Sequence, residues 1–252
     1  MYCRQVCQIY RGSAKIEGGF SVNKAVMLLR KADAIVMDVD STIIRKEGID
    51  MLAQYLHKES EIRALKGKLV HRLIIAGEIS YEEFTSNSLS ILKPSRQICE
   101  DCLTQFPYEI CDKAPEFIEA CKNMGKRVYL ASGGYVQMIE PLMKILNLPL
   151  SHLFAIPLIF DDAGEYAGFD ISADTADMNG KAVVIEKIRR SLPGGTGIVV
   201  NIGDGILDAN AYPSSDAFIG YTGVTHKVKA LEKAMMYVSS YQDLLKILTD
   251  SE

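Results

Sequence analysis

Apolar residues along the chain fall into short continuous runs, separated by segments with the spacing of amphipathic helices. The apolar runs at residues 33–38, 127–131, 154–160, 197–202 and 216–220 predict buried strands. Helical spacing or helix end signals lie between and after them, at residues 22–31, 115–125, 135–146, 181–191, 226–234 and 241–249. Strands that alternate with helices in this way predict an α/β fold, with a parallel sheet covered on both faces.

Two segments depart from this alternation. A turn at residues 161–164 is followed by a short return at 166–169, which predicts a small β-hairpin. Residues 48–106 contain no strand-like run, and their apolar residues keep helical spacing until Pro94 and Pro107 interrupt the pattern. We therefore predict a core domain formed by residues 1–47 and 107–252, with residues 48–106 inserted as a helical unit.

Two acids stand side by side at the end of the first predicted strand. Asp38 and Asp40 follow the apolar run Ala34-Ile35-Val36-Met37. In an extended chain, residues two apart point the same way and lie about 6.6 Å from each other. At an effective dielectric constant of about 20, two carboxylates at that separation repel by about 2.5 kcal/mol. Such a pair at the end of a buried strand calls for a partner that offsets the repulsion.

Other polar groups follow strands of the same predicted sheet. In open α/β sheets ligands bind at the carboxyl ends of the strands, so we expect these groups to converge on one crevice. They are Ser132, Gly133, Gly134, Lys181, Asp204 and Asp208. Several carboxylates in one crevice favour Mg²⁺, and a Ser-Gly-Gly segment before a helix suits a phosphate. Together these groups predict phosphoryl transfer, with Asp38 as nucleophile and Asp40 as general acid and base.

Composition narrows the class of protein further. The 252 residues are 48% hydrophobic with a net charge of −4, and no basic block stands out, which argues against nucleic acid or a membrane as partner. No apolar run reaches the roughly 18 residues of a membrane helix, so we expect a cytoplasmic protein. Residues 1–20 as a targeting segment remain the alternative. Cys99 and Cys102 have a zinc-like spacing without a second ligand pair, so packing or surface thiols are the better interpretation.

The motifs resemble those of the haloacid dehalogenase superfamily, and within it the phosphoserine phosphatase family of eukaryotic type. The resemblance is carried by ADAIVMDVDSTIIRKEGID, YLASGGY, GEYAGFD, NGKAVV and IGDG, and it runs from about residue 25 to the C-terminus. It implies a Rossmann-like core with the helical insert as a cap. It implies a cytoplasmic hydrolase of serine biosynthesis, often a homodimer, that converts O-phospho-L-serine to serine and phosphate.

The resemblance also implies roles for individual residues. Mg²⁺ would be held by Asp38, the main-chain carbonyl of Asp40, and Asp204, with Asp208 in support. The phosphoryl group would be bound by Ser132, Gly133 and Lys181. Glu47, in RKEGID, would meet the amino group of the substrate.

Departures from the family pattern cluster where the amino acid portion of the substrate would lie. The cap arginine that holds a carboxylate is replaced by Ser88, and Leu207 replaces a threonine. Other departures are Ile75, Ala76 and Ile156. Cap cations that could substitute for the arginine are Arg63, Lys66, Lys68 and Arg72. Two alternatives to phosphoserine hydrolysis therefore stay open: a phosphatase of another small phosphate ester, and a binding protein without turnover.

Overall fold

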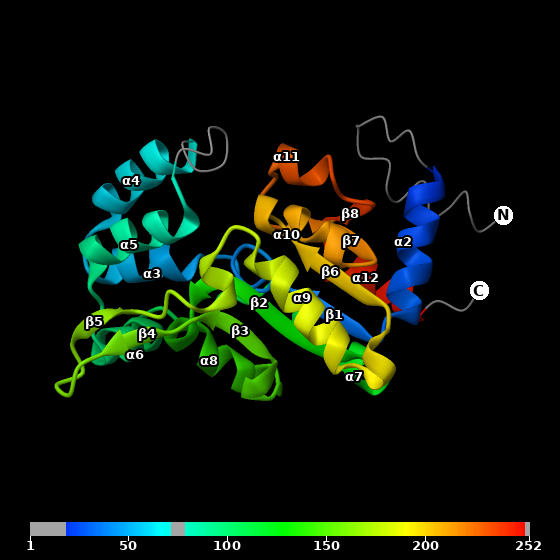
Figure 1. Ribbon diagram of the computed structural model, residues 1–252, viewed down its shortest axis with the longest axis horizontal. Coiled ribbons are helices and arrows are strands. Elements are labelled where there is room, and N and C mark those ends of the chain that lie inside the picture. Colours follow the sequence, from blue (N-terminus) through cyan, green and yellow to red (C-terminus); the bar gives the residue numbers. More distant parts are fainter. Residues whose placement is uncertain (1–18, 72–78, 250–252) are drawn as a thin grey trace.

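A six-stranded parallel sheet forms the centre of the chain in the computed structural model, which describes residues 19–71 and 79–249 (Figure 1). The strand order is β3-β2-β1-β6-β7-β8. The bounds are β1 (Ala34–Met37), β2 (Arg127–Tyr135), β3 (Leu153–Ile156), β6 (Val199–Gly203), β7 (Ala217–Tyr221) and β8 (Met236–Val238). Every residue of β1, β6 and β7 is buried, which explains why these strands are apolar without alternation.

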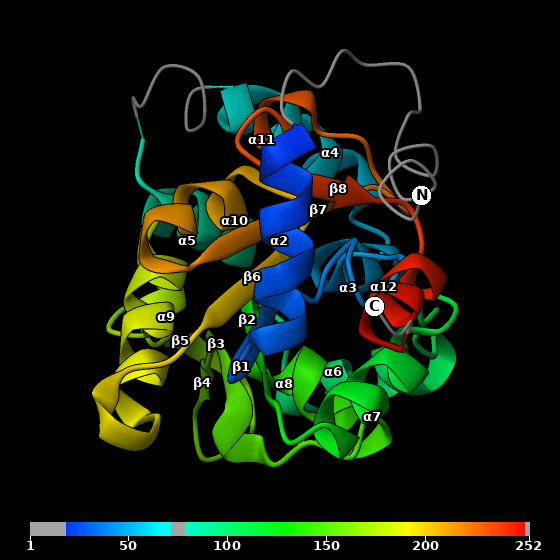
Figure 2. The same cartoon turned by 90° about the vertical axis from the view of Figure 1, so that its right-hand side faces the viewer.

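Helices cover both faces of the sheet, as the alternation along β1 requires. Ile35 and Met37 point into one core, and Ala34 and Val36 point into another on the opposite face. The first face is covered by α2 (Gly19–Lys31), α7 (Ala114–Asn123), α8 (Val136–Ile145) and α12 (Tyr241–Thr249). Figure 2 shows α2 across the front of the sheet with α12 beside it. The second face is covered by α9 (Gly180–Ser191), α10 (Ile206–Asn210) and α11 (Val228–Leu231).

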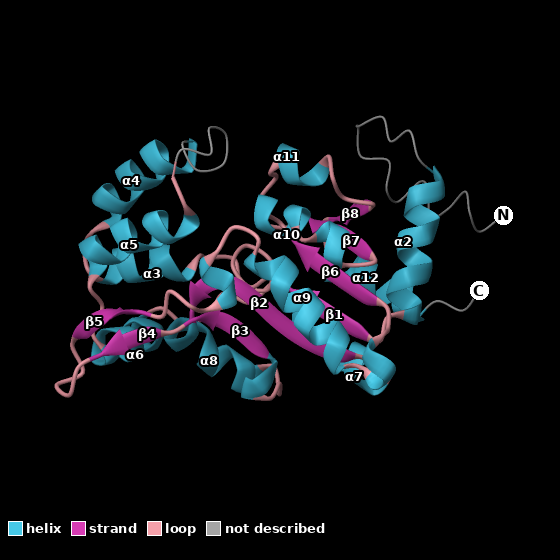
Figure 3. Cartoon of the chain, viewed as in Figure 1, coloured by secondary structure: helices cyan, strands magenta, loops and turns pink. Residues whose placement is uncertain are grey.

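A second group of helices lies at one end of the sheet and has a core of its own (Figure 3). It contains α3 (Gly48–Tyr55), α4 (Glu59–His71), α5 (Tyr81–Leu92) and α6 (Arg96–Gln105), and the hairpin of β4 (Leu158–Phe160) and β5 (Tyr166–Phe169) packs against it. Ser80 and Ser95 cap α5 and α6, each accepting a hydrogen bond from a backbone N–H three residues on. Cys99 and Cys102 are buried free thiols within this group's core, in agreement with the packing interpretation.

The predicted strand at residues 154–160 is two strands in the structure. β3 joins the main sheet and β4 joins the hairpin, with Pro157 between them. Proline has no N–H to donate to a sheet ladder, so it marks the place where the chain leaves one sheet for the other. Short 3₁₀ turns complete the connections, at η2 (Leu150–His152), η3 (Asp174–Ala176), η4 (Pro193–Gly195) and η5 (Tyr212–Ser214). Within the described ranges, no helix combines the length and apolar character needed to cross a membrane.

Candidate active site

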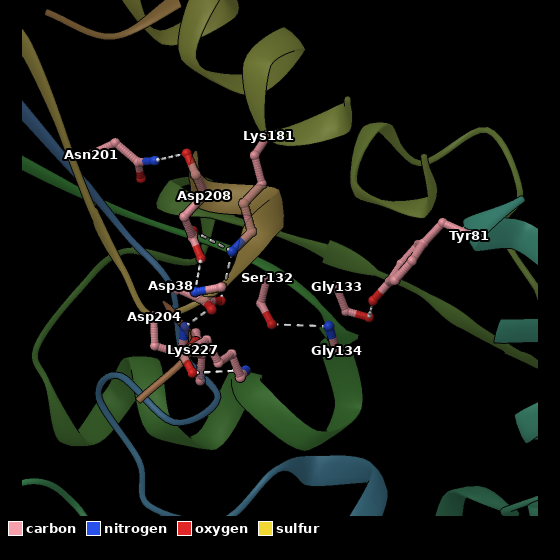
Figure 4. Close-up of polar contacts among 12 residues, drawn as sticks. Asp38, Tyr81, Ser132, Gly133, Gly134, Lys181, Asn201, Asp204, Asp208 and Lys227 are labelled. Carbon is pink, nitrogen blue, oxygen red and sulfur yellow. Dashed lines mark hydrogen bonds and ion pairs between the residues drawn. The ribbon is translucent and has the colours of Figure 1, made fainter. Parts of the chain in front are cut away.

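Three neighbouring strands deliver the predicted polar groups to one edge of the sheet. Asp38 directly follows β1, Asp204 directly follows β6, and Ser132 lies in the C-terminal half of β2. Because β2, β1 and β6 are adjacent and parallel, their carboxyl ends meet at this edge. The groups line a cavity of about 570 Å³ between the sheet and the helices α3–α5. We call the part lined by Asp38, Lys181, Asp204 and Asp208 the inner end of the cavity. Figure 4 shows the polar contacts of these residues.

Lys181 lies between two carboxylates at this inner end. Its Nζ is 2.8 Å from Asp38 Oδ1 and 2.7 Å from Asp208 Oδ1, and the side chain is almost fully buried. The first turn of α9 places it there, one residue after Gly180, whose Cβ position is filled by the backbone of Asp174. Lys181 therefore supplies the positive charge that two buried acids need in order to stay ionised.

Asp38 and Asp40 titrate far from the range of exposed acids. Burial, reinforced by Asp208 and opposed by Lys181, raises the pKa of Asp38 to about 6. Burial and the neighbouring charge of Asp38 raise the pKa of Asp40 to about 7, although Gly48 N donates a hydrogen bond of 2.9 Å to Asp40 Oδ1. A carboxyl group with a pKa near neutrality can both give and take a proton, as general acid and base catalysis requires.

An acidic cluster lies beside Lys181. One carboxylate oxygen from each of Asp38, Asp204 and Asp208 lies within 4.8 Å of the others. Burial is the main cause that raises the pKa values of both Asp204 and Asp208. Buried carboxylate oxygens at this spacing are suitable ligands for a hard divalent cation such as Mg²⁺. The donor set of the site therefore fits the metal that the sequence predicts.

Each member of the cluster is oriented by neighbours. Gly205 N donates to Asp208 Oδ2 at 3.1 Å, and the amide of the buried Asn201 donates to the main-chain oxygen of Asp208 at 2.9 Å. Asp204 Oδ2 accepts a hydrogen bond from the Thr225 hydroxyl and forms an ion pair of 2.8 Å with Lys227 (Figure 4). Asp204 and Asp208 are thus held in place by groups from β6, from the turn that follows it and from the loop after β7.

The segment Ser132-Gly133-Gly134 forms the wall opposite Lys181. Gly134 N donates to Ser132 Oγ at 2.9 Å. A Cβ at Gly134 would lie 3.0 Å from Asp40 Oδ2, and one at Gly133 would overlap the Tyr81 hydroxyl, which donates to the Gly133 carbonyl. Glycine therefore lets the backbone approach both a core acid and a helix of the insert. The segment expected to stand directly before a helix is the extended end of β2, and α8 begins after Tyr135, at Val136.

A second set of charged side chains lies where the cavity meets the insert, and we call this the outer end of the cavity. Lys66 Nζ, on α4, is 2.6 Å from Glu47 Oε2 and 2.7 Å from Asp50 Oδ1. Burial raises the pKa of Glu47, but the charge of Lys66 and its hydrogen bond outweigh that effect and lower it. Aromatic and aliphatic side chains from α3, α5 and α10 form much of the remaining wall, among them Ile49, Phe84 and Leu207.

Every site residue predicted from the sequence lines this cavity: Asp38, Asp40, Glu47, Ser132, Gly133, Lys181, Asp204 and Asp208. Ser88 does not line it, because it is fully buried on α5 and its hydroxyl donates to the Phe84 carbonyl at 2.9 Å. Of the cap cations, Lys66 lines the cavity, while Arg63 lines only a neighbouring pocket, which Lys66 also borders. Arg72, Ile75, Ala76 and Gly77 lie outside the described residues.

Sequence reasoning missed three residues that line or touch the site. Tyr81 was assigned only to helical spacing, and Thr225 and Lys227 lie in the loop after β7, where no motif drew attention to them. The position of that loop, at the carboxyl end of another parallel strand, was the available signal.

The family model for haloacid dehalogenase-like hydrolases matches residues 35–212 of this chain. The chain belongs to this family. The phosphoserine phosphatase of Drosophila melanogaster is 32% identical over 221 residues, which cover 88% of this chain and 80% of the relative. The phosphoserine phosphatase of Homo sapiens is also 32% identical, over 218 residues that cover 86% and 94% of the two chains.

A solved structure described as a phospho-aspartyl intermediate analogue of phosphoserine phosphatase has the same fold. Its TM-score is 0.72 with 24% identity, and the match covers 87% of this chain and 100% of that one. The chain is accordingly a hydrolase of the haloacid dehalogenase family that is similar to phosphoserine phosphatases.

Proposed function

We propose that the chain is a Mg²⁺-dependent phosphomonoesterase that works through a phosphorylated Asp38. The observation that carries the proposal is the position of Asp38, which is ion-paired with Lys181, belongs to the acidic cluster, and faces the Ser132-Gly133-Gly134 segment across one cavity. Nucleophile, cation and phosphate-binding backbone then surround a single place for the reacting phosphorus.

The residues of the chain divide the reaction between them. Asp38 attacks phosphorus as the P–O bond to the alcohol breaks, and Asp40, protonated near neutral pH, gives its proton to the departing oxygen. Asp40 then accepts a proton from water, whose oxygen attacks phosphorus and releases phosphate from Asp38. Ser132, the Gly133 N–H and Lys181 bind the phosphoryl oxygens throughout.

The metal ligands of the proposal are Asp38, the main-chain carbonyl of Asp40, and Asp204, with Asp208 in support. When bound, Mg²⁺ would neutralise the crowded carboxylates and polarise a phosphoryl oxygen. Without the metal, Lys227 offsets part of the charge of Asp204, because its Nζ lies 2.8 Å from Asp204 Oδ2. Residues 48–106 are proposed as a cap over a core of residues 1–47 and 107–252, which is supported by the reach of Tyr81 from α5 to Gly133.

O-phospho-L-serine is the reference substrate, because the similar proteins are named for it and Glu47 lines the cavity where an amino group would bind. The buried position of Ser88 favours a second candidate, a small phosphate ester without a carboxylate. A role in serine biosynthesis, a cytoplasmic location and a homodimer remain predictions.

Phosphate release from p-nitrophenyl phosphate tests the chemistry without depending on the natural alcohol. We expect turnover with Mg²⁺, none with EDTA, and none for Asp38→Asn, with circular dichroism as the control for folding. Turnover that survives both treatments would exclude the proposed mechanism. Absence of turnover, together with calorimetric binding of inorganic phosphate, would favour a binding protein instead.

A further inference from the structure

We infer that the alcohol portion of the substrate is uncharged, so that the preferred ester is the phosphate of a small neutral alcohol or polyol. This inference rests on the proposed phosphatase function and concerns the end of the cavity away from Asp38. It follows from the mutual pairing of Lys66, Glu47 and Asp50 at that end, from the position of Ser88, and from the nature of the remaining wall.

A carboxylate on the substrate has no buried cation to receive it. Ser88 is fully buried and its hydroxyl is already bonded to the Phe84 carbonyl, so it contributes nothing to the cavity. Among the described residues no arginine lines the cavity. Lys181 is paired with Asp38 and Asp208 at the phosphoryl end, and Lys227 is paired with Asp204.

Among the described residues, Lys66 is the cation of the insert that lines the cavity, and it already contacts two acids. It contacts Glu47 at 2.6 Å and Asp50 at 2.7 Å, and only 24% of its side chain is exposed. One positive and two negative charges leave this group at −1, so an approaching carboxylate would be repelled. An ammonium group would have to displace Lys66 from Glu47 before it gained a partner there.

Lys229 is the remaining lysine in the described wall of the cavity, and it is exposed. An exposed lysine holds a carboxylate weakly because water and salt screen the pair. It therefore cannot replace a buried arginine as the group that selects a carboxylate-bearing substrate.

The rest of this end suits an uncharged molecule. Ile49, Phe84, Met178 and Leu207 provide apolar surface. The hydroxyls of Tyr81 and Thr85 are neutral polar groups in the same wall, and Tyr81 donates its proton to the Gly133 carbonyl, which leaves its oxygen free to accept one from an alcohol. A charged group placed against this wall would lose hydration without gaining a counter-charge.

The alternative is an exchange of partners, in which a zwitterionic substrate gives its ammonium to Glu47 and its carboxylate to the released Lys66. Four matched esters separate the two cases. They are O-phospho-L-serine with both charges, O-phosphoethanolamine with the ammonium alone, 3-phospho-D-glycerate with the carboxylate alone, and sn-glycerol 3-phosphate with neither. The measurement is kcat/KM for phosphate release with Mg²⁺, with p-nitrophenyl phosphate as the reference ester.

We expect glycerol phosphate to have the highest kcat/KM of the four, at least about tenfold above phosphoserine. Phosphoserine above all three others would overturn the inference and establish the exchange. If p-nitrophenyl phosphate is not hydrolysed either, the proposed function fails, and the preference is then read from calorimetric binding of the same four esters to the Asp38→Asn variant. Weaker binding of glycerol phosphate than of phosphoserine in that experiment would overturn the inference by itself.

Lys66→Met tests the role of the ion-paired group. It releases Glu47 and takes the group from −1 to −2, so we expect phosphoethanolamine to improve relative to glycerol phosphate, while 3-phosphoglycerate falls by no more than about tenfold relative to glycerol phosphate. A larger selective loss of phosphoserine and 3-phosphoglycerate would show that Lys66 binds a carboxylate, contrary to the inference. Arg63→Ala is the matched control, because Arg63 lies on the same helix but does not line the cavity.

Discussion

The two ends of the cavity are built from different parts of the fold, and they handle charge in different ways. At the inner end, Lys181 and the buried acids come from strand ends, from α10 and from the first turn of α9, and each is almost inaccessible to water. At the outer end, Lys66 and Asp50 come from the insert and Glu47 directly precedes it, and their side chains are 24%, 52% and 33% exposed. The difference suggests that the inner end determines the reaction and the outer end determines the alcohol.

Breaking an ion pair should cost more free energy at the inner end than at the outer end, because the inner pairs are buried. A buried ion pair that loses one partner leaves an uncompensated charge in a medium of low polarity, whereas a half-exposed pair is screened by water. The same change made at the two ends should therefore have unequal effects, and the predictions below use that contrast.

The largest expected effect is on turnover, when a carboxylate is replaced by an amide at each end. Asp38→Asn should lower kcat by about 10⁴-fold or more, because an amide is not an effective nucleophile. Asp50→Asn should change kcat by less than about tenfold, because Asp50 contacts Lys66 and no reacting group. Phosphate release from p-nitrophenyl phosphate measures both; similar losses in the two variants would contradict the division of roles.

Replacing Lys181 at the inner end and Lys66 at the outer end compares what the two lysines contribute to the free energy of unfolding. Lys181→Met leaves Asp38 and Asp208 without their cation and should cost about 3 to 5 kcal/mol in the free energy of unfolding. Lys66→Met should cost about 1 kcal/mol or less, since its acids are partly exposed. Urea unfolding in EDTA gives both values. An equal loss of unfolding free energy in the two variants would show that burial does not determine how much each ion pair contributes.

The pH dependence of stability should report on Asp40. Its pKa is raised to about 7, so the folded protein holds that proton more tightly than the unfolded chain does. The stabilising effect of protonated Asp40 is present below about pH 4 and is lost as the pH rises through about 7. In EDTA, the free energy of unfolding of the wild-type protein minus that of Asp40→Asn should therefore fall between about pH 5 and pH 8. A difference that stays constant or rises over that range would exclude the raised pKa.

Tyr81→Phe should have a small effect, comparable with that of Lys66→Met. It removes one hydroxyl that donates to the Gly133 carbonyl at 3.3 Å, a long hydrogen bond between the two ends of the cavity. We expect a loss of about 0.5 to 1.5 kcal/mol in unfolding free energy, with the aromatic packing against Phe84 retained. Tyr81→Leu, which also removes the ring, is the control; equal losses in the two variants would assign the whole effect to the hydroxyl.

The inner end was predictable from sequence because each of its groups is fixed by local position. Asp38 and Asp204 directly follow buried apolar strands, and the parallel order of those strands then brings them together. The ion pairs of Lys66 and the approach of Tyr81 to Gly133 depend on how helices distant in sequence pack, which periodicity does not encode. The strand β8 was also missed, because its three residues are too short a run to stand out.

Acid-quenched mass spectrometry tests the central claim most directly, since it detects the covalent step at the inner end. Protein mixed with Mg²⁺ and glycerol phosphate or p-nitrophenyl phosphate should gain the mass of one phosphoryl group, and peptide mapping should place it on Asp38. Asp38→Asn should gain none. Turnover without any phosphorylated protein, or a phosphoryl group on another residue, would contradict the account.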